Sequence, residues 1–266
     1  MSKIRIMTDS ASDISAADER RYDIAVIPFP VSLGEQSYIS RVDFNNEQFY
    51  ALMAEHDDIP KTSQITPFQF MDIYLEQARA GVSDLILVLI NSKGSSTYDN
   101  SVQAARMFYD EYPEHKSFRV HSFDGMGYNA IYGAPVVEAA RMLEAGSGLD
   151  EICEYLKNIL PRRQVYFGIY DLKYAARSGR IPSAAAFLGN KLNLKPVMKL
   201  TDDGTRIDKF FVKRTMSAAV HGIINYLKEK GIGSQHIFYI VHAAAQEEAE
   251  NCLLYTSPSP RDVEES

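Results

Sequence analysis

The sequence predicts an α/β protein in which a mainly parallel sheet is followed by a smaller α+β domain. Short apolar runs alternate with amphipathic stretches through the first 160 residues, which is typical of strands joined by crossover helices. Residues 85–90 read Leu-Ile-Leu-Val-Leu-Ile, and a strand that is apolar on both faces belongs in the middle of a parallel sheet. After about Leu160 the pattern changes, and a second layer of strands and helices begins.

Four strands and four helices are expected in the first domain. The expected strands are Ile4–Met7, Ile24–Pro28, Leu85–Asn91 and Phe118–His121. The expected helices are Asn46–Glu55, Pro67–Arg79, Ser96–Glu111 and Ala130–Glu144. Proline suits the first turn of a helix, and Gly146 is placed to end the last one.

The second domain is expected to mix strands and helices. The expected strands are Val165–Tyr170, Pro196–Leu200, Arg206–Val212 and Ile237–Val241. The expected helices are Asp171–Ser178, Ser183–Lys191, Thr215–Lys230 and Ala244–Asn251. The turn Thr201-Asp202-Asp203-Gly204 between two strands predicts a tight antiparallel hairpin.

We expect the domains to cover residues 1–160 and 161–252, although no Gly/Ser-rich linker marks the boundary. Residues 253–266 contain two prolines and three serines after an Ala- and Glu-rich helix. This change of composition predicts a disordered or foreign tail, resembling translated adapter sequence. The second domain would then be truncated.

Composition excludes several classes of function. The 28 basic and 35 acidic residues give a formal charge of -7, so no overall positive field attracts nucleic acid. The longest apolar run is far shorter than the ~20 residues that span a bilayer, and the N-terminus has no signal-peptide apolar region. Two cysteines in 266 residues make neither a disulfide framework nor a metal knuckle, so a reducing cytoplasm fits best.

Common catalytic motifs are absent. The six histidines show no metal-ligand spacing, and no His-Glu-x-x-His or Cys-x-x-Cys occurs, so no metal is expected. The sequence contains no P-loop and no Gly-x-Ser-x-Gly nucleophile elbow.

Polar residues follow the first expected strand at Thr8-Asp9-Ser10-Ala11-Ser12-Asp13. Ligands bind at the carboxyl ends of strands in α/β folds, which makes Asp9 and Ser10 candidate site residues. Serine and aspartate are also preferred helix N-caps, so capping is an equally simple explanation.

Two further hydroxyl-rich segments precede helices. Pro60-Lys61-Thr62-Ser63-Gln64 comes shortly before Pro67, and Asn91-Ser92-Lys93-Gly94-Ser95-Ser96 follows the most apolar strand. Two strand-to-helix turns converging across a switch point of the sheet would hold one carboxylate or phosphate with hydroxyl and backbone N–H donors. Both segments have an alternative role as helix caps.

Arg177-Ser178-Gly179-Arg180-Ile181-Pro182 ends an expected helix. Arginine is enriched at interface hot spots, so Arg180 is a candidate for binding a partner. Alternatively, it is a helix-end cation that complements the helix dipole.

Taken together, these segments resemble the DegV family. The resemblance rests on Thr8–Asp13, on Pro-Lys-Thr-Ser-Gln at 60–64, on the turn at 92–98, and on the segments 172–181 and 194–197, Leu-Lys-Tyr-Ala-Ala-Arg-Ser-Gly-Arg-Ile and Leu-Lys-Pro-Val. It extends from about Lys3 to Asn251.

The resemblance implies a bacterial, cytoplasmic fatty-acid-binding protein of two domains, similar to the lipid-carrying subunit of fatty acid kinase. A long-chain fatty acid would bind with its carboxylate on Thr62 and Ser95, next to Ser63 and Ser96. A separate ATP-dependent kinase subunit would phosphorylate the carboxylate, with Arg180 toward that partner. The protein itself would not be an enzyme, would need no other cofactor, and would touch membranes only for lipid exchange.

The sequence departs from the family pattern at three places. Ser96 stands where the family turn has glycine, and His121-Ser122 stands where the family has Asp-Ser after a strand. Nothing after Asn251 resembles the family's final His-x-Gly-Pro-Gly-like segment.

Two other functions compete with lipid binding. A regulatory protein–protein module predicts that changes at Thr62 and Ser95 have no effect while changes at Arg180 do. A small-molecule kinase or hydrolase predicts turnover without a partner, and it requires a nucleotide or metal motif.

Overall fold

The computed structural model describes residues 3–170, 172–179, 181, 194–233, 236–247 and 249–250. The chain divides into two compact units. The first contains the described residues up to Arg163 together with Asp202–Gly204, and the second contains the other described residues.

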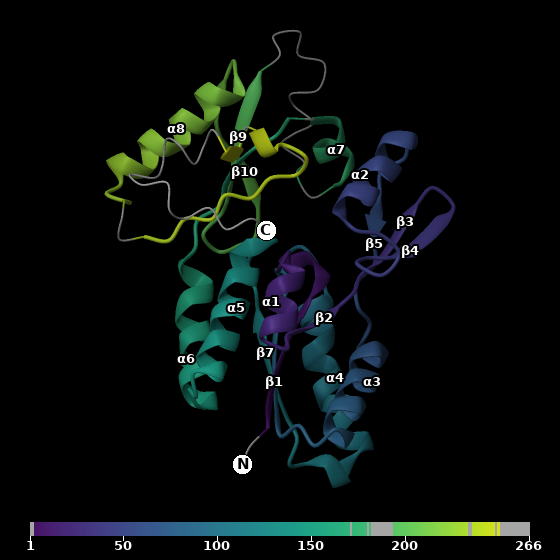
Figure 1. The fold of residues 1–266 in the computed structure, drawn as a ribbon. Coiled ribbons are helices and arrows are strands. Elements are labelled where there is room, and N and C mark those ends of the chain that lie inside the picture. Colours follow the sequence, from purple (N-terminus) through teal and green to yellow (C-terminus); the bar gives the residue numbers. More distant parts are fainter. Residues whose placement is uncertain are drawn as a thin grey trace. The chain divides into compact units, whose positions relative to one another are not determined.

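The first unit is built around a four-stranded sheet (Figure 1). Its strands are β1 (Ile4–Asp9), β2 (Ala25–Ile27), β6 (Asp84–Leu89) and β7 (Arg119–Asp124). They lie in the order β2-β1-β6-β7, and each neighbouring pair is parallel. All six residues of β6 are buried, so the prediction of a central parallel strand is confirmed.

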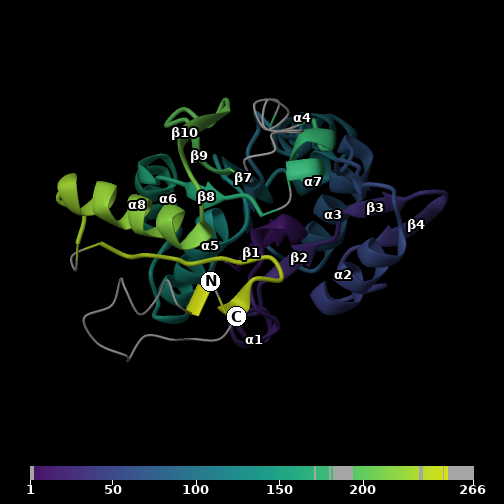
Figure 2. The ribbon, with the colours of Figure 1, turned by 90° about the horizontal axis from the view of Figure 1, so that it is seen from above.

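Helices cover both faces of this sheet (Figures 1 and 2). They are α1 (Ala16–Arg21), α3 (Pro67–Arg79), α4 (Thr97–Glu111), α5 (Ala130–Glu144) and α6 (Leu149–Ile159). Successive side chains of a strand point to opposite faces. Leu85, Leu87 and Leu89 accordingly pack with residues of α3 and α4, while Ile86 and Val88 pack with residues of α5 and α6.

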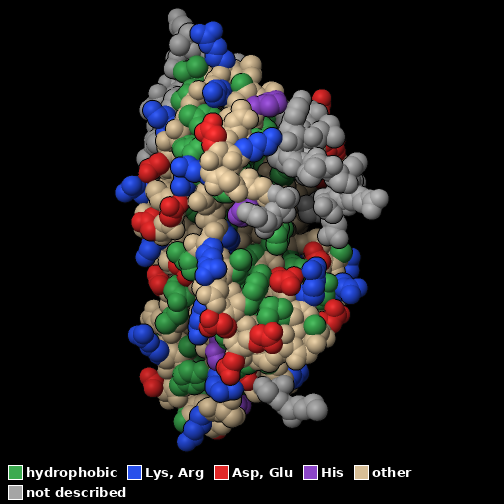
Figure 3. Space-filling model, turned by 90° about the vertical axis from the view of Figure 1, so that its left-hand side faces the viewer, with side chains coloured by type: hydrophobic (Ala, Val, Ile, Leu, Met, Phe, Trp, Pro, Cys, Tyr) green, Lys and Arg blue, Asp and Glu red, His purple; other side chains and the backbone are tan. Residues whose placement is uncertain are grey.

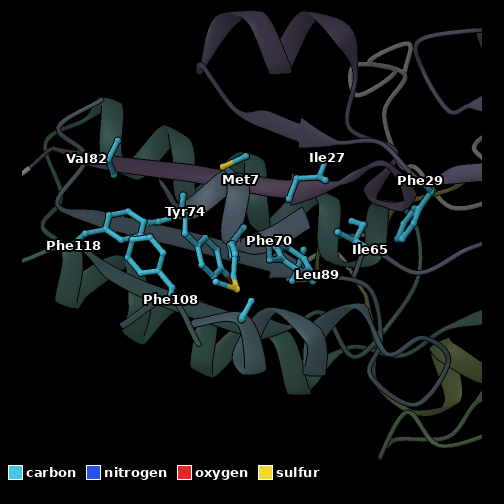
Figure 4. Packing of buried hydrophobic residues seen from close by; sticks show 14 residues of the cluster. Met7, Ile27, Phe29, Ile65, Phe70, Tyr74, Val82, Leu89, Phe108 and Phe118 are labelled. Atoms are coloured by element: carbon cyan, nitrogen blue, oxygen red, sulfur yellow. The ribbon is translucent and has the colours of Figure 1, made fainter. Parts of the chain in front are cut away.

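Aromatic rings fill the core beneath α3 and α4 (Figure 4). The Tyr74 ring lies edge-on to Phe108 with ring centroids 6.0 Å apart, and Phe108 lies edge-on to Phe118 at 5.6 Å. Such pairs contribute about 1 kcal/mol each beyond the area they bury. The buried Tyr74 hydroxyl donates to the Ser101 carbonyl oxygen at 2.9 Å, so this core holds α4 in place without leaving the hydroxyl unpaired.

A small antiparallel sheet, which the sequence does not predict, lies between β2 and α3 in the chain. Its strands are β3 (Pro30–Leu33), β4 (Gln36–Ile39) and β5 (Lys61–Thr62), in the order β4-β3-β5. The helix α2 (Asn46–Glu55) has the predicted bounds and begins with a capping box of Asn45 and Gln48. Strands of two to four residues are too short to show the alternation by which a strand is predicted.

The second unit contains an antiparallel sheet of order β10-β9-β8 with helices beside it. Its elements are β8 (Tyr166–Gly168), α7 (Leu172–Arg177), β9 (Lys195–Leu200), β10 (Ile207–Lys213) and α8 (Met216–Glu229). The strands β9 and β10 form the predicted hairpin. Tilted and edge-on contacts among the rings of Tyr166, Phe210 and Tyr226 join the sheet to α8, which gives the α+β unit that the sequence predicts.

The structure differs from the expected secondary structure in one further strand and one further helix. Residues 237–241 form no strand, and Ile237 is 82% exposed. Side chains that favour strands are not enough to form one, because the backbone of a strand also needs the edge of another strand to pair with. No described segment pairs with residues 237–241. The helix α6 is unexpected, although four apolar residues in it follow helical spacing: Leu149, Ile152, Cys153 and Leu156.

Other expectations are met in part or lie elsewhere. Within the expected helix Ala244–Asn251, residues 246–247 and 249–250 are helical. The expected helix Ser183–Lys191 and the segment 253–266 lie outside the described residues, so the foreign-tail hypothesis stays a prediction.

Charged side chains of both signs are mixed with hydrophobic ones on the face seen in Figure 3. No helix among the described residues is long and apolar enough to cross a membrane.

Replacing Gly133 by alanine is expected to destabilise the first unit by roughly 2 kcal/mol, the usual range for overpacking. A Cβ at this position of α5 would overlap the backbone carbonyl oxygen of Ser12, which cannot rotate away. Gly148→Ala is the matched control, because no atom lies within 4 Å of its added Cβ and the weaker N-cap costs only about 0.5 kcal/mol. Chemical denaturation measures both variants, and equal stabilities would contradict the close approach of α5 to Ser12.

Candidate functional site

The candidate site lies at the carboxyl end of the parallel sheet, between β1 and β6. From β1 the strand order proceeds to β2 on one side, and from β6 it proceeds to β7 on the other. Loops diverge at such a switch point, and α/β folds bind ligands there. β1 ends in Asp9, and β6 is followed by the turn formed by residues 90–96, which we call the Ser95 turn.

Asp9 ties three elements together at this edge and is fully buried. Its Oδ1 accepts hydrogen bonds from the Tyr132 hydroxyl at 2.6 Å and the Ala11 N–H at 3.0 Å, and its Oδ2 accepts from the Ile90 N–H at 2.7 Å. Burial raises the pKa of Asp9 to about 6, although these three hydrogen bonds favour the charged form and limit the rise. Asp9 therefore fixes the loops of the site from within.

Ser10 joins the parallel sheet to the small antiparallel sheet. Its Oγ lies 2.7 Å from the Oγ of Ser40, and the Phe29 N–H donates to both hydroxyls, at 3.0 and 2.9 Å. The bond from Ala11 to Asp9 is of the N-cap kind, so capping describes the local structure of this segment. The side chains of both candidate residues, Asp9 and Ser10, therefore form hydrogen bonds with other groups of the protein.

The Ser95 turn is closed by its own backbone and side chains. The Asn91 carbonyl oxygen accepts from the N–H groups of Gly94 and Ser95, at 3.0 and 3.1 Å. The Ser95 Oγ accepts from the Thr97 N–H at 3.3 Å and lies 2.9 Å from the Thr97 Oγ1. Ser95 is half-buried, whereas Ser96 is exposed at the N-cap of α4 and makes no side-chain capping bond.

The segment 60–64 is not a strand-to-helix turn of the parallel sheet, which corrects the expectation. Thr62 lies in β5, opposite Val31, and Ser63 follows with its N–H bonded to the Pro30 carbonyl oxygen at 3.0 Å. The N-cap of α3 is Thr66. The Thr62 and Ser63 hydroxyls are exposed and have no hydrogen-bond partner among the described residues.

Ile65 connects this segment to the Ser95 turn. Its N–H donates to the Thr97 Oγ1 at 3.4 Å, and its carbonyl oxygen accepts from the Asn100 Nδ2 at 2.7 Å. Consecutive Cα atoms are 3.8 Å apart, so Thr62 lies within about 11 Å of Ile65 and Ser95 within about 8 Å of Thr97. The first turn of α4 thus contacts Ile65, which follows the segment 60–64, and itself follows the Ser95 turn.

Asp124, which the sequence analysis did not select, lies at the end of β7. β7 continues to Asp124, three residues beyond the predicted end at His121, so Ser122 lies inside the strand and does not follow it. The residue at the carboxyl end of this strand is therefore acidic. His121 instead bonds the buried Asp84, with 3.0 Å between its Nε2 and the Asp84 Oδ1.

Arg163 supports the loop after β7. Its guanidinium donates to the carbonyl oxygens of Gly125 and Ile131, and its Nε has no hydrogen-bond partner among the described residues. Burial lowers the pKa of Arg163 to about 10, while the charge of Asp124 opposes that fall. Neither Arg163 nor Tyr132 lies in a recognisable motif, so only their three-dimensional neighbours identify them.

Among the described residues, no group of three or more His, Cys, Asp or Glu side chains is arranged to hold a metal ion. Arg180 lies outside the described residues, so its role in binding a partner stays a prediction.

Comparison with known proteins identifies the family. The family model described as "Uncharacterised protein, DegV family" matches residues 3–262. This chain belongs to the DegV family. A DegV domain-containing protein of Caldanaerobacter subterraneus subsp. tengcongensis is 32% identical over 233 residues, which are 87% of this chain and 79% of that protein.

Solved DegV structures share the fold. A Thermus thermophilus DegV family protein, described as binding fatty acid, is 27% identical with a TM-score of 0.71, covering 85% of this chain and 77% of that chain. DegV of Bacillus subtilis, described as a fatty acid binding protein, is 25% identical with a TM-score of 0.79, covering 96% and 88%. The predicted family and fold class are confirmed.

The raised pKa of Asp9 predicts how stability depends on pH. A carboxyl whose pKa is about 6 in the folded protein, against an ordinary value of 3.8, binds protons more tightly when the protein is folded. The free energy of unfolding should therefore fall as pH rises through the interval from about 4 to 6, by on the order of 3 kcal/mol at most.

The Asp9→Asn variant is the reference for this measurement, because it lacks the titrating group. Denaturant unfolding of both proteins between pH 4 and 7 should show the wild type losing stability relative to the variant. Carboxyl NMR gives the pKa directly. A difference in stability that does not change with pH would contradict the assignment.

Proposed function

We propose that this protein binds a long-chain fatty acid, with the carboxylate held by the hydroxyls of Thr62 and Ser95 beside those of Ser63 and Ser96. The observation that supports the proposal is the pair of bonds from Ile65 to Thr97 and Asn100, which holds the segment after Thr62 and Ser63 against the first turn of α4. The Ser95 turn follows β6 at the switch point of the parallel sheet, where ligands bind in α/β folds.

The hydrogen bonds of the Ser95 turn leave a donor for the ligand. A hydroxyl has one proton to donate and two lone pairs to accept with. The Thr97 Oγ1 accepts from the Ile65 N–H and lies 2.9 Å from the Ser95 Oγ, a contact in which either hydroxyl can be the donor. The Ser95 Oγ also accepts the Thr97 N–H. When Thr97 donates to Ser95, the proton of Ser95 is available for a carboxylate oxygen.

Neutral donors suit a carboxylate that has to react further. Hydroxyls hold the anion without a fixed salt bridge and leave one carboxylate oxygen able to attack a phosphoryl group. Asp9 and Asp124 lie at the same edge of the sheet, but their oxygens are occupied by bonds from the protein. The headgroup site therefore gains its attraction from donors at its surface.

The acyl chain would supply most of the affinity. Burying about fourteen methylenes at ~0.8 kcal/mol each contributes ~11 kcal/mol before the entropy lost on association is subtracted. The hydroxyls then orient the headgroup. The T. thermophilus and B. subtilis relatives that are described as binding fatty acids support this division of roles for a chain of the same fold.

We further propose that a separate ATP-dependent kinase phosphorylates the bound carboxylate, with Arg180 contacting that kinase in the cytoplasm and membranes touched only when lipid is exchanged. This extends the family resemblance, and the protein is then a carrier and not itself an enzyme. Incubation with ATP should give no acyl phosphate without the kinase subunit, and turnover by this chain alone would reject the carrier role.

Fatty acid is expected to copurify with the protein and to be lost from a Thr62→Ala/Ser95→Ala variant. Each hydrogen bond to a charged group contributes about 1.5–3 kcal/mol, so affinity should fall at least about tenfold. Denaturation of the purified protein followed by mass spectrometry identifies and counts the ligand.

A Ser37→Ala/Ser217→Ala variant is the matched control, since it removes two exposed hydroxyls from β4 and α8 and should retain the ligand. A folded wild-type protein that contains no fatty acid and takes up none would refute the lipid-binding function. Of the two competing functions, the regulatory protein–protein module would then be favoured, because the small-molecule kinase or hydrolase requires a nucleotide or metal motif that the sequence lacks.

A further inference from the structure

The side chain of Asp124 holds the Ser95 turn from one side. Its Oδ1 accepts from the N–H groups of Ser92 at 3.0 Å and Met126 at 2.8 Å, and its Oδ2 accepts from the Ser92 hydroxyl. The carboxylate therefore binds the turn after β6 and the loop after β7 simultaneously. These three bonds occupy both of its oxygens.

Asp9 holds the same turn from the opposite side. β1 and β7 are the two strands that pair with β6, and each ends in an aspartate. Asp9 accepts from Ile90 at 2.7 Å, and Asp124 accepts from Ser92. Two carboxylates from neighbouring strands thus fix the residues on either side of Asn91.

Asn91 transmits this constraint to Ser95. Its N–H donates to the Gly127 carbonyl oxygen at 3.1 Å, and its own carbonyl oxygen accepts the N–H groups of Gly94 and Ser95. The direction of that carbonyl is set by the peptide units at residues 90–92. The position of the Ser95 backbone, and hence of its hydroxyl, follows from the bonds of Asp124 and Asp9.

We propose that Asp124 is a positioning residue for the headgroup site, which sets the place of the Ser95 hydroxyl by clamping Ser92. This deepens the proposed function and rests on it. Asp124 acts through the turn and does not touch the ligand. Its negative charge by itself disfavours an anion nearby, so any affinity it adds for a fatty acid comes from geometry.

Two substitutions separate geometry from charge. Asp124→Ala removes all three bonds and the charge. Asp124→Asn removes the charge, keeps an Oδ1 for the Ser92 and Met126 N–H groups, and offers an amide proton to the Ser92 oxygen. A positioning role predicts that the Asp124→Asn variant, unlike Asp124→Ala, binds a fatty acid at least as tightly as the wild type does.

The test compares palmitic acid with 1-hexadecanol, whose chain has the same length and whose headgroup carries no charge. Isothermal titration of the delipidated full chain should show that Asp124→Ala weakens palmitic acid about tenfold, the equivalent of one hydrogen bond to a charged group, while 1-hexadecanol binds as in the wild type. Ser92→Ala should also lower the affinity for palmitic acid relative to the affinity for 1-hexadecanol, by a smaller factor. Asp110→Ala, an exposed acidic residue late in α4, is the matched control and should change neither affinity.

Amide hydrogen exchange gives an independent readout in the unliganded protein. Asp124→Ala should speed exchange at Ser95, and Asp124→Asn should restore its protection. Equal weakening of both ligands in Asp124→Ala, or wild-type affinity for palmitic acid in that variant, would overturn the inference and leave the fatty-acid proposal standing. A wild-type protein that binds neither ligand would overturn both. If the Asp124→Ala variant does not fold, the Asp124→Asn and Ser92→Ala variants test the inference through the same comparison of the affinities for palmitic acid and 1-hexadecanol.

Discussion

The first unit depends on one buried carboxylate, that of Asp9. A charged group that is removed from water carries a large desolvation penalty unless donors surround it, and here the donors come from three different elements: Ala11 after β1, Ile90 after β6 and Tyr132 in α5. Because these donors converge on one side chain, the ends of β1 and β6 and the start of α5 have to take up one arrangement together. The raised pKa of Asp9, about 6, shows that the compensation is incomplete.

The hydrogen bonds that converge on Asp9 explain why the polar groups of the site are of two kinds. The carboxylates of Asp9 and Asp124 point into the protein, where backbone N–H groups and hydroxyls satisfy them. The hydroxyls of Thr62, Ser63 and Ser96 remain exposed. These segments keep their negative charges engaged and expose hydroxyl donors, with the exposed Lys61 and Lys93 beside them in the chain. Hydroxyl donors at the surface can bind an anion because the nearby carboxylates are already hydrogen-bonded inside the protein.

Much of the fold follows from the sequence, because long periodic segments carry strong signals. Residues 85–90 are apolar on both faces, and the bounds of α2, α3 and α5 agree with those predicted from capping residues and periodicity. The small antiparallel sheet gave no such signal, since its strands have four, four and two residues. Residues 237–241 show the opposite failure, because their strand-forming side chains have no described edge to pair with. The candidate hydroxyls at Thr62 and Ser95 could be selected from the sequence, but Asp124 and Arg163 could not, because their roles arise from contacts between loops that are distant in the chain.

The same contacts explain why a serine at position 96 is compatible with the site. A glycine would be required there if the turn needed a left-handed backbone or a close approach, but Ser96 has φ −76° and is exposed, a conformation open to any residue. The close approach in this turn occurs two positions earlier, at Gly94, where an added Cβ would overlap the Tyr128 hydroxyl. The constraint on the turn therefore lies between Asn91 and Gly94, where the bonds from Asp9 and Asp124 also act, and the residues after it are free to present hydroxyls to a ligand.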